Sequence, residues 1–339
     1  MSGLPRITVA IPTYNAAAFL QATLDSLSAQ THQDFEVLVV DDASRDETCA
    51  LVERHGFPSL RIHRNPTNRG CTHTIPLCAQ LATHDLLVYL CHDDLLAPNA
   101  LAHIAGAFRD PSIGAVTRPL FWFEGDRLDH PLRVVRPFSE QQDTVIRIND
   151  EESKLHSLIT TLGQLSALGF RRSMMTVPFT NDVFTVHIQA FLGVFREHPV
   201  VMLSDYVLAV RSETSQSRTL GSIYRRSPLL SWDEMLKSVF SDPRHAHALH
   251  ACRRTICTEN DVGLIQVKCT GGMRALLQEI GVSIRVWPMN AIRPHFLFWC
   301  LVTLLLPRRW LRWSIDRLKQ ILGPRVAAGV RLSGGCMST

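Results

Sequence analysis

Residues 5–120 alternate short apolar runs with amphipathic stretches. The runs Ile7–Ile11 and Phe35–Val40 are almost wholly apolar, which is typical of parallel strands buried on both faces. Between them, apolar residues recur at helical spacing. The pattern predicts strands at 7–11, 35–40, 60–63 and 84–90, and helices at about 15–30 (capped by Asn15), 44–55 (opened by the capping box Ser44 and Glu47), 70–82 and 98–108. Four strand–helix units without a hairpin signal predict a doubly wound, mostly parallel α/β sheet flanked by helices.

The pattern beyond residue 114 is mixed. Two apolar runs, Val116–Phe123 and Val200–Arg211, predict strands, while 150–162 and 182–195 have helical periodicity. After Ser212 the chain turns helical and then basic. We therefore expect an α/β half at 1–115, a second half of the same domain at 116–215 and a helical C-terminal extension at 216–339.

Composition places the chain among globular proteins. Of its 339 residues, 46% are hydrophobic and 19% charged, which excludes a disordered chain. The net charge of +4 is too small to indicate a nucleic-acid partner. The charge is uneven, however, because residues 285–339 contain nine Arg or Lys and one acid, while the remainder has 26 basic and 30 acidic residues. A basic tail thus follows an acidic body.

The tail also contains eleven successive, mainly apolar residues, Phe296–Leu306, directly before the cluster 308–313, which holds three Arg and two Trp. Eleven residues are too few to span a bilayer, which needs about 20. One interpretation is a buried helix followed by a solvated basic turn. The interpretation we favour is a contact near 292–320 with an anionic membrane surface, because Trp and Arg together suit a lipid interface. The N-terminus shows no secretory signal, and the nine Cys match no zinc pattern, so we expect a cytoplasmic protein, peripheral on the inner face of the cell membrane.

Polar residues gather where three of the predicted strands end. Residues 11–15 follow the first strand, Asp41 and Asp42 the second, and residues 92–94 the fourth. In an open parallel sheet, ligands bind at the carboxyl ends of the strands. Two carboxylate pairs there suit a divalent metal on a diphosphate and a hydrogen-bond donor such as an imide. The plainer alternative for Asp41 or Asp42 is a helix cap.

Several nucleotide and hydrolase motifs are missing. No GxGxxG follows the first strand, and neither a GxxxxGK[ST] loop nor a GxSxG elbow occurs. A dinucleotide-dependent dehydrogenase, a P-loop enzyme and an α/β-hydrolase are therefore disfavoured.

Taken together, these residues resemble the family 2 inverting glycosyltransferases of the GT-A fold, of the kind that builds bacterial surface polysaccharides. The resemblance is close over about 6–110 and looser to about 215. It rests on Val9–Asn15, Leu24–Thr31, Asp34–Ser44, Asn68–Gly70 and the acidic motif at 91–94.

The resemblance implies roles for individual residues. Thr13 and Tyr14 would line the nucleotide base, Asp42 would accept its imide N–H, and Asp93 would hold Mn²⁺ or Mg²⁺ with Asp94 beside it. The full set implied for the nucleotide is Pro12, Thr13, Tyr14, Asn15, Asp42, Arg69 and Asp93. The chain departs from the family's DxD motif at Cys91, which replaces aspartate, and His92 takes the variable position. We interpret both as non-ligands, with a soft metal ligand as the alternative.

The family also has an aspartate base about 90 residues after the metal motif. Asp182, before a helical run and after the acceptor-side segment Gly169–Arg172, matches it. An ordinary helix cap is the alternative for Asp182. Arg211, in a segment that resembles the strand closing the family's catalytic domain, would face the diphosphate.

The expected activity is metal-dependent transfer of a sugar from a UDP- or dTDP-sugar to a glycan or lipid-linked acceptor, with inversion, in polysaccharide or cell-envelope glycan biosynthesis. The alternative, suggested by Cys91, is a catalytically impaired protein that only binds nucleotide sugars.

Overall fold

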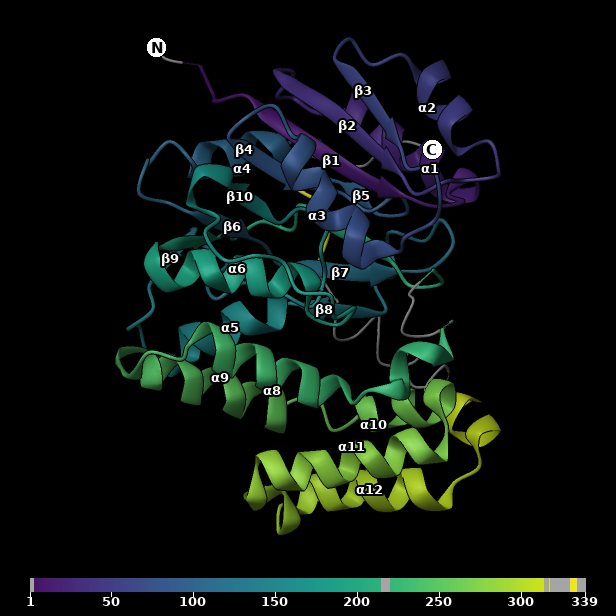
Figure 1. The fold of residues 1–339 in the computed structure, drawn as a ribbon, viewed down its shortest axis with the longest axis vertical. Coiled ribbons are helices and arrows are strands. Elements are labelled where there is room, and N and C mark those ends of the chain that lie inside the picture. The colour runs from purple at the N-terminus through teal and green to yellow at the C-terminus, as the bar shows by residue number, and fades with distance from the viewer. Residues whose placement is uncertain (1–2, 215–219, 314–316, 318–329, 334–339) are drawn as a thin grey trace.

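A computed structural model describes residues 3–214, 220–313, 317 and 330–333. The chain forms a large central sheet, a smaller second sheet, and a layer of helices at one end that the C-terminal part contributes (Figure 1). Among the described residues, no helix combines the length and apolar character needed to cross a bilayer.

The first four long strands are parallel, as predicted. They are parallel because each crossover passes through a helix. Their order in the sheet is β3-β2-β1-β4. Helices α1, α2 and α4 pack on one face of this sheet through residues such as Leu24 and Leu101, while α3 covers the other face through residues such as Ile75. The bounds are β1 Ile7–Thr13, α1 Ala17–Ser28, β2 Phe35–Asp41, α2 Thr48–His55, β3 Leu60–Arg64, α3 Cys71–Leu81, β4 Leu86–Tyr89 and α4 Ala100–Ala107. The predicted doubly wound α/β class is confirmed.

The sheet continues past β4 with strands from the middle of the chain. Strand β10 lies antiparallel to β4, and β6, β11 and β9 follow it. The second sheet has the order β5-β12-β7-β8. The bounds are β5 Leu95–Leu96, β6 Ala115–Thr117, β7 Leu120–Phe123, β8 Arg133–Val135, β9 Thr144–Ile146, α5 Glu152–Thr161, β10 Gly169–Arg171, η1 Arg172–Met174, α6 Val186–Glu197, β11 Val200–Met202 and β12 Leu208–Arg211.

Each of the two long strands predicted in this region is in fact two strands. The run Val116–Phe123 divides into β6 and β7, and the run Val200–Arg211 divides into β11 and β12. Each run leaves the central sheet and enters the second one, with β11 parallel to β6 and β12 parallel to β7. The first break falls at Arg118 and Pro119, because proline has no N–H to donate to a ladder.

Three predicted helix starts are wrong by a few residues. Helix α1 begins at Ala17, because Asn15 has a left-handed backbone (φ 47°) and its side chain accepts from the N–H of Arg45. Helix α2 begins at Thr48 without a capping box, because the Ser44 hydroxyl donates to Asp41 instead. Helix α6 begins at Val186, so Asp182 lies in the preceding loop. At Asn15 and Asp182, distant residues contact the side chain that the local pattern assigned to a cap, whereas Ser44 bonds to Asp41, three residues before it.

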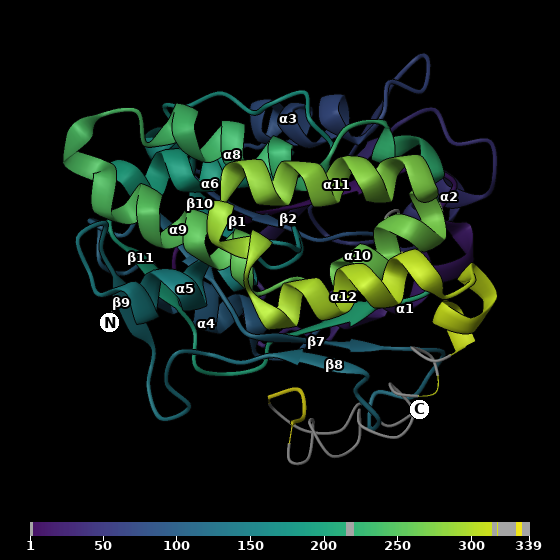
Figure 2. The same ribbon diagram turned by 90° about the horizontal axis from the view of Figure 1, so that it is seen from below.

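The C-terminal helices pack on the middle of the chain, α9 against α5 and α8 against α6 (Figure 2). Residues 314–316 and 318–320 of the predicted membrane segment lie outside the described residues. At 330–333 the chain again contacts the second sheet, where Val330 packs with Phe121. The bounds are η2 Gly221–Arg225, α8 Pro228–Val239, η3 Pro243–His245, α9 Ala246–Thr258, α10 Gly263–Gln266, η4 Val267–Gly271, α11 Met273–Val286, η5 Pro288–Ala291 and α12 Pro294–Leu305.

Candidate functional site

The three polar segments at the carboxyl ends of β1, β2 and β4 lie against one another. The N–H of Asp42 donates to the carbonyl of Thr13 (2.8 Å), and the His92 ring lies 3.4 Å from the carbonyl of Pro12. Parallel strands bring these ends to one edge of the sheet, where the sequence pattern places them.

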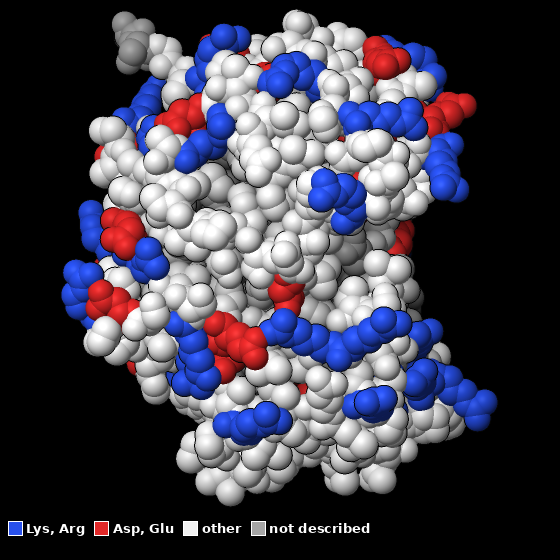
Figure 3. Space-filling view, viewed as in Figure 1, with Lys and Arg blue, Asp and Glu red and all other residues white. Residues whose placement is uncertain are grey.

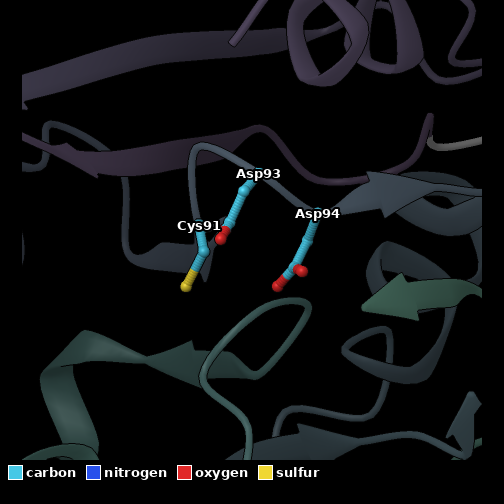
Figure 4. A group of neighbouring side chains, drawn as sticks. All are labelled: Cys91, Asp93 and Asp94. Carbon is cyan, nitrogen blue, oxygen red and sulfur yellow. The ribbon is translucent and has the colours of Figure 1, made fainter. Parts of the chain in front are cut away.

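The turn after β4 forms a group of three ligand atoms. One atom each from Cys91, Asp93 and Asp94 lies within 4.8 Å of the others (Figure 4). The Asp94 carboxylate accepts from the Ser166 hydroxyl (2.5 Å) and from the N–H of Arg211 (3.0 Å). Within the described residues no hydrogen bond to the Asp93 carboxylate is found, which leaves this group able to bind a ligand. His92 faces Pro12 and does not join the group.

This turn holds two carboxylates with little compensating charge. Burial, together with the neighbouring Asp93, raises the pKa of Asp94 to about 8. Burial, followed by Asp94 and Asp93, holds the pKa of the Cys91 thiol well above its usual range, so the thiol stays protonated at neutral pH. A divalent cation would relieve the repulsion, and carboxylate oxygens are ligands that Mn²⁺ and Mg²⁺ prefer. The donor set therefore fits such an ion through Asp93 and Asp94.

Asp42 is buried and organises the loop that follows β3. Its two oxygens accept from the side chain of Asn65 (2.7 Å) and from the N–H groups of Arg69 (3.0 and 3.1 Å) and Gly70 (2.7 Å). Gly70 has φ 82°, a conformation that side chains other than glycine rarely adopt. These bonds present the exposed Arg69 beside the sheet edge. An imide N–H would have to share Asp42 with these donors.

At the end of β1, Thr13 is buried within the fold, whereas the next residue, Tyr14, is exposed. The Thr13 hydroxyl is buried and donates to Asp41 (3.2 Å). Asp41 also accepts from the N–H of Ser44 (3.0 Å), so Asp41 holds the fold at this edge. Tyr14 is 43% exposed, which leaves its ring available to stack on a planar ligand.

Asp182 is only 12% exposed and is bonded to the C-terminal helices. Its Oδ2 accepts from the Ser231 hydroxyl (2.6 Å) and lies 3.4 Å from the Arg226 guanidinium, while its Oδ1 accepts from the N–H of Phe184 (2.9 Å). The bond from Phe184 closes a local turn at Asp182, and Ser231 of α8 ties the same side chain to the C-terminal helices.

Arg211 lies beside the acidic turn but does not present a free cation. Its guanidinium lies over the rings of Phe123 (4.6 Å) and Phe19 (4.9 Å) and donates to the carbonyl of Gly125 (2.9 Å). It also donates to the carbonyl of Asp93 (3.3 Å). These contacts make Arg211 a stabilising residue of the turn, and that it also faces a diphosphate stays a prediction.

Sequence reasoning missed four residues around these carboxylates: Ser166, Arg118, Ser231 and Arg226. Arg118 is fully buried and donates to the carbonyls of Thr161 (2.9 Å) and Gln164 (2.8 Å). These two hydrogen bonds fix the loop that carries Ser166. Burial lowers the pKa of Arg118 to about 9. The pair Arg118-Pro119 inside an apolar run was the available signal. The two serines have none, because their partners lie 72 and 49 residues away along the chain.

A groove of about 1070 Å³ leads away from this edge. It lies between α3 and the segment 172–181, with Arg69 and Asn181 among its lining residues. Its walls combine apolar side chains such as Leu77 and Phe179 with polar ones such as Gln80. Figure 3 shows the surface on this side hollowed between the sheets and the C-terminal helices, with a row of Lys and Arg below the hollow.

Comparison with known proteins places this site in a family. Residues 8–166 match the model of glycosyl transferase family 2. An uncharacterized protein of Mycobacterium tuberculosis is 27% identical over 247 residues, which are 70% of this chain and 77% of that protein. The O-antigen chain rhamnosyltransferase RfbN of Salmonella typhimurium is 29% identical over 176 residues, 50% of this chain and 53% of that one, so the match spans about half of the rhamnosyltransferase.

Solved structures share the fold. TarS residues 1–349 of S. aureus in complex with UDP-GlcNAc superpose with a TM-score of 0.62 at 16% identity, over 94% of this chain and 92% of that one. The mannosyltransferase PcManGT of Pyrobaculum calidifontis, in complex with GDP-Man and Mn²⁺, superposes with a TM-score of 0.55 at 18% identity. The match covers 94% of this chain and 88% of that one. Residues 8–166 form a family 2 glycosyltransferase domain, and the chain has the GT-A fold.

Proposed function

We propose that the protein transfers a sugar from a nucleotide-diphosphate sugar to a glycan or lipid-linked acceptor, with inversion, in polysaccharide or cell-envelope glycan biosynthesis. The observation that carries this proposal is the acidic turn at the sheet edge. There Asp93 accepts no hydrogen bond from the described residues, next to a segment that exposes Tyr14. An unbonded carboxylate beside a second one is costly unless a cationic ligand binds there.

The donor would bind across the ends of β1 and β2. Tyr14 would stack on the base, Asp42 would accept from its imide N–H, and Arg69 would face the diphosphate. Pro12, Thr13 and Asn15 would complete the nucleotide site. An imide favours a UDP- or dTDP-sugar over a GDP-sugar, since guanine offers a different edge. The similarity to a UDP-GlcNAc complex supports a UDP-sugar, whereas the GDP-Man complex shows that the fold accepts guanosine too.

A divalent ion, Mn²⁺ or Mg²⁺, would be held by Asp93 and Asp94. When bound, the ion would neutralise the diphosphate as it leaves the sugar. The Mn²⁺ in PcManGT supports this assignment. Cys91 and His92 would contribute no ligand, because Mn²⁺ and Mg²⁺ prefer oxygen ligands to a soft thiol and the imidazole faces Pro12.

Asp182 would act as the base. Its carboxylate would take the proton of the acceptor hydroxyl while that oxygen attacks the anomeric carbon and the bond to the diphosphate breaks. One displacement inverts the anomeric configuration and forms no bond between sugar and protein. Ser231 and Arg226 fix the position of the carboxylate through their contacts with Oδ2.

The acceptor would enter by the groove beside α3, which opens near Arg69 and Asn181. Its mixture of apolar and hydrogen-bonding walls suits sugar rings. We place the reaction in the cytoplasm at the inner face of the cell membrane, where lipid-linked acceptors are presented.

The test is a thermal-shift panel of nucleotide sugars with and without Mn²⁺, followed by turnover of the donor that stabilises the protein most. We expect stabilisation by a UDP- or dTDP-sugar that depends on the metal. NMR of the product from an α-linked donor should show a β linkage. Binding without hydrolysis or transfer would instead indicate an impaired nucleotide-sugar-binding protein, and no stabilisation by any donor would refute the proposal.

A further inference from the structure

The outer side of α12 is an exposed apolar surface. Of the seventeen large apolar side chains that are exposed within the described residues, ten lie between Met289 and Trp313. On α12 these include Leu297, Leu301, Leu304 and Leu305, whose spacing puts them on one side of the helix. We call this side, together with the segment 308–313, the α12 face. Helix α12 lies at the end of the molecule away from the sheets, and the segment after it turns back beside α10 (Figures 1 and 2).

Buried contacts fix the orientation of α12 and so keep this face exposed. The opposite side of α12 buries Phe296 and Cys300. The ammonium of Lys268, itself buried, donates to the carbonyls of Thr303 and Leu306 at the C-terminal end of the helix. These bonds satisfy carbonyls that a helix end leaves unpaired and fix the direction of α12.

The segment after α12 is anchored in the same way. Leu311 is buried against Ile265 and Cys269, and the Arg312 guanidinium donates to the carbonyl of Cys269 (2.9 Å). Trp310 and Trp313 remain 57% and 64% exposed. The contacts of Leu311 and Arg312 therefore fix the backbone of this segment with both indole rings exposed.

Charge decides which partner suits the face. Arg308, Arg309 and Arg312 adjoin the two indoles, and residues 294–313 contain no Asp or Glu. A second copy of the chain would bring the same positive charges without acidic partners from this segment. Anionic lipid headgroups supply the missing charge, and Trp and Arg settle at the depth of those headgroups.

We propose that the α12 face binds the surface of an anionic bilayer, with α12 lying parallel to it. A helix of 12 residues is about 18 Å long, short of the hydrocarbon thickness of about 30 Å, so it would lie in the interface. This deepens the membrane location proposed above by naming the contacting residues. It can be tested without the transfer reaction, so failure of one does not imply failure of the other.

The test is co-sedimentation of the full chain with vesicles at low salt. Vesicles of equal parts phosphatidylcholine and phosphatidylglycerol should bind the protein, shift its tryptophan emission to the blue, and release it as salt rises. Vesicles of phosphatidylcholine alone should bind it far more weakly. The double variant Arg308→Gln/Arg309→Gln should bind anionic vesicles roughly 30-fold more weakly, at about fivefold for each arginine.

The apolar part is tested by Leu301→Glu/Leu305→Glu, which should reduce binding roughly 100-fold. Val262→Glu, also exposed and in the same helical layer, is the matched control and should bind as the unaltered chain does. Thermal melts by circular dichroism establish that each variant is folded. The proposal fails if the full chain does not sediment with anionic vesicles, or if the Leu301→Glu/Leu305→Glu variant binds normally. It also fails if that variant only converts a dimer into a monomer without altering vesicle binding.

Discussion

The hydroxyl of Ser231 lies 2.6 Å from Oδ2 of Asp182 and donates a hydrogen bond to it. Ser231 is on α8, in the helical layer, whereas Asp182 lies in the loop before α6. Arg226, from the same layer, forms an ion pair with the same oxygen. The C-terminal helices therefore contribute directly to the surroundings of the proposed base.

Removing this hydroxyl tests whether the contact matters to the reaction. Ser231→Ala should lower kcat about tenfold, because a hydrogen bond to a charged group contributes about 1.5 kcal/mol, while the donor KM stays unchanged. Ser231→Thr, which keeps the hydroxyl, is the control. An unchanged kcat in Ser231→Ala would show that the bond has no part in the reaction.

The base itself is tested by Asp182→Asn. This change keeps the shape of the side chain but removes its basicity, so kcat should fall by roughly 10²–10⁴ while UDP affinity stays near normal. The measurement is steady-state transfer together with calorimetric binding of UDP. Asp205 is another partly exposed acid, and Asp205→Asn should change neither kcat nor the affinity for UDP. Near-normal turnover in Asp182→Asn would overturn the assignment.

Asp93→Ala should abolish metal-dependent donor binding, because it removes the carboxylate that accepts no hydrogen bond from the described residues. Cys91→Ala should have little effect, because Mn²⁺ and Mg²⁺ prefer oxygen ligands to a soft thiol. Mn²⁺ binding measured by electron paramagnetic resonance, with and without UDP, distinguishes the two. Loss of Mn²⁺ binding in Cys91→Ala would show that the thiol is a true ligand.

Asp42→Ala should weaken UDP binding roughly 10- to 100-fold, as expected for loss of a charged acceptor. The structure adds a second effect, since Asn65, Arg69 and Gly70 all donate to this carboxylate. The variant should therefore also melt at a lower temperature. Asn65→Ala keeps the carboxylate and should retain most UDP affinity. Equal binding of UDP by Asp42→Ala and the unaltered chain would contradict the assigned role.

The buried His187 predicts a loss of stability in mild acid. Burial, with a smaller effect from Arg118, lowers the pKa of His187 to about 4, and its Nε2 bonds to the carbonyl of Leu162 (2.9 Å). The unfolded chain takes up a proton below pH 6.5, where the folded chain does not. The contribution of His187 to stability is thus full above that pH and declines as the pH falls toward 4, by about 2 kcal/mol between pH 7 and 5. Asp94, whose pKa is raised to about 8, contributes in the opposite direction over this range, so substitution is needed to isolate the effect of His187.

Urea unfolding at several pH values measures this decline. The difference in stability between the unaltered chain and His187→Gln should change by about 2 kcal/mol between pH 7 and 5, whereas for His130→Gln, at an exposed position, it should stay constant. Identical dependence in His187→Gln and the unaltered chain would show that His187 is not buried as a neutral group.

Sequence alone determined the parallel half of the fold and the place of its polar strand ends. Runs such as Phe35–Val40 report local burial on both faces, and the carboxylates that end them must lie at one sheet edge whenever the strands are parallel. This is why the sequence pattern predicts that Asp42 and Asp93 lie at the same edge of the sheet.

Only the tertiary structure decided what those residues contact. It split the run Val116–Phe123 between two sheets, turned Ser44 from a cap into a partner of Asp41, and set Ser166 on Asp94 and Ser231 on Asp182. Hydrophobic periodicity records whether a position is buried, which depends on its near neighbours in the chain. The partner of a buried hydroxyl or carboxylate depends on how distant segments pack, and no local pattern carries that information.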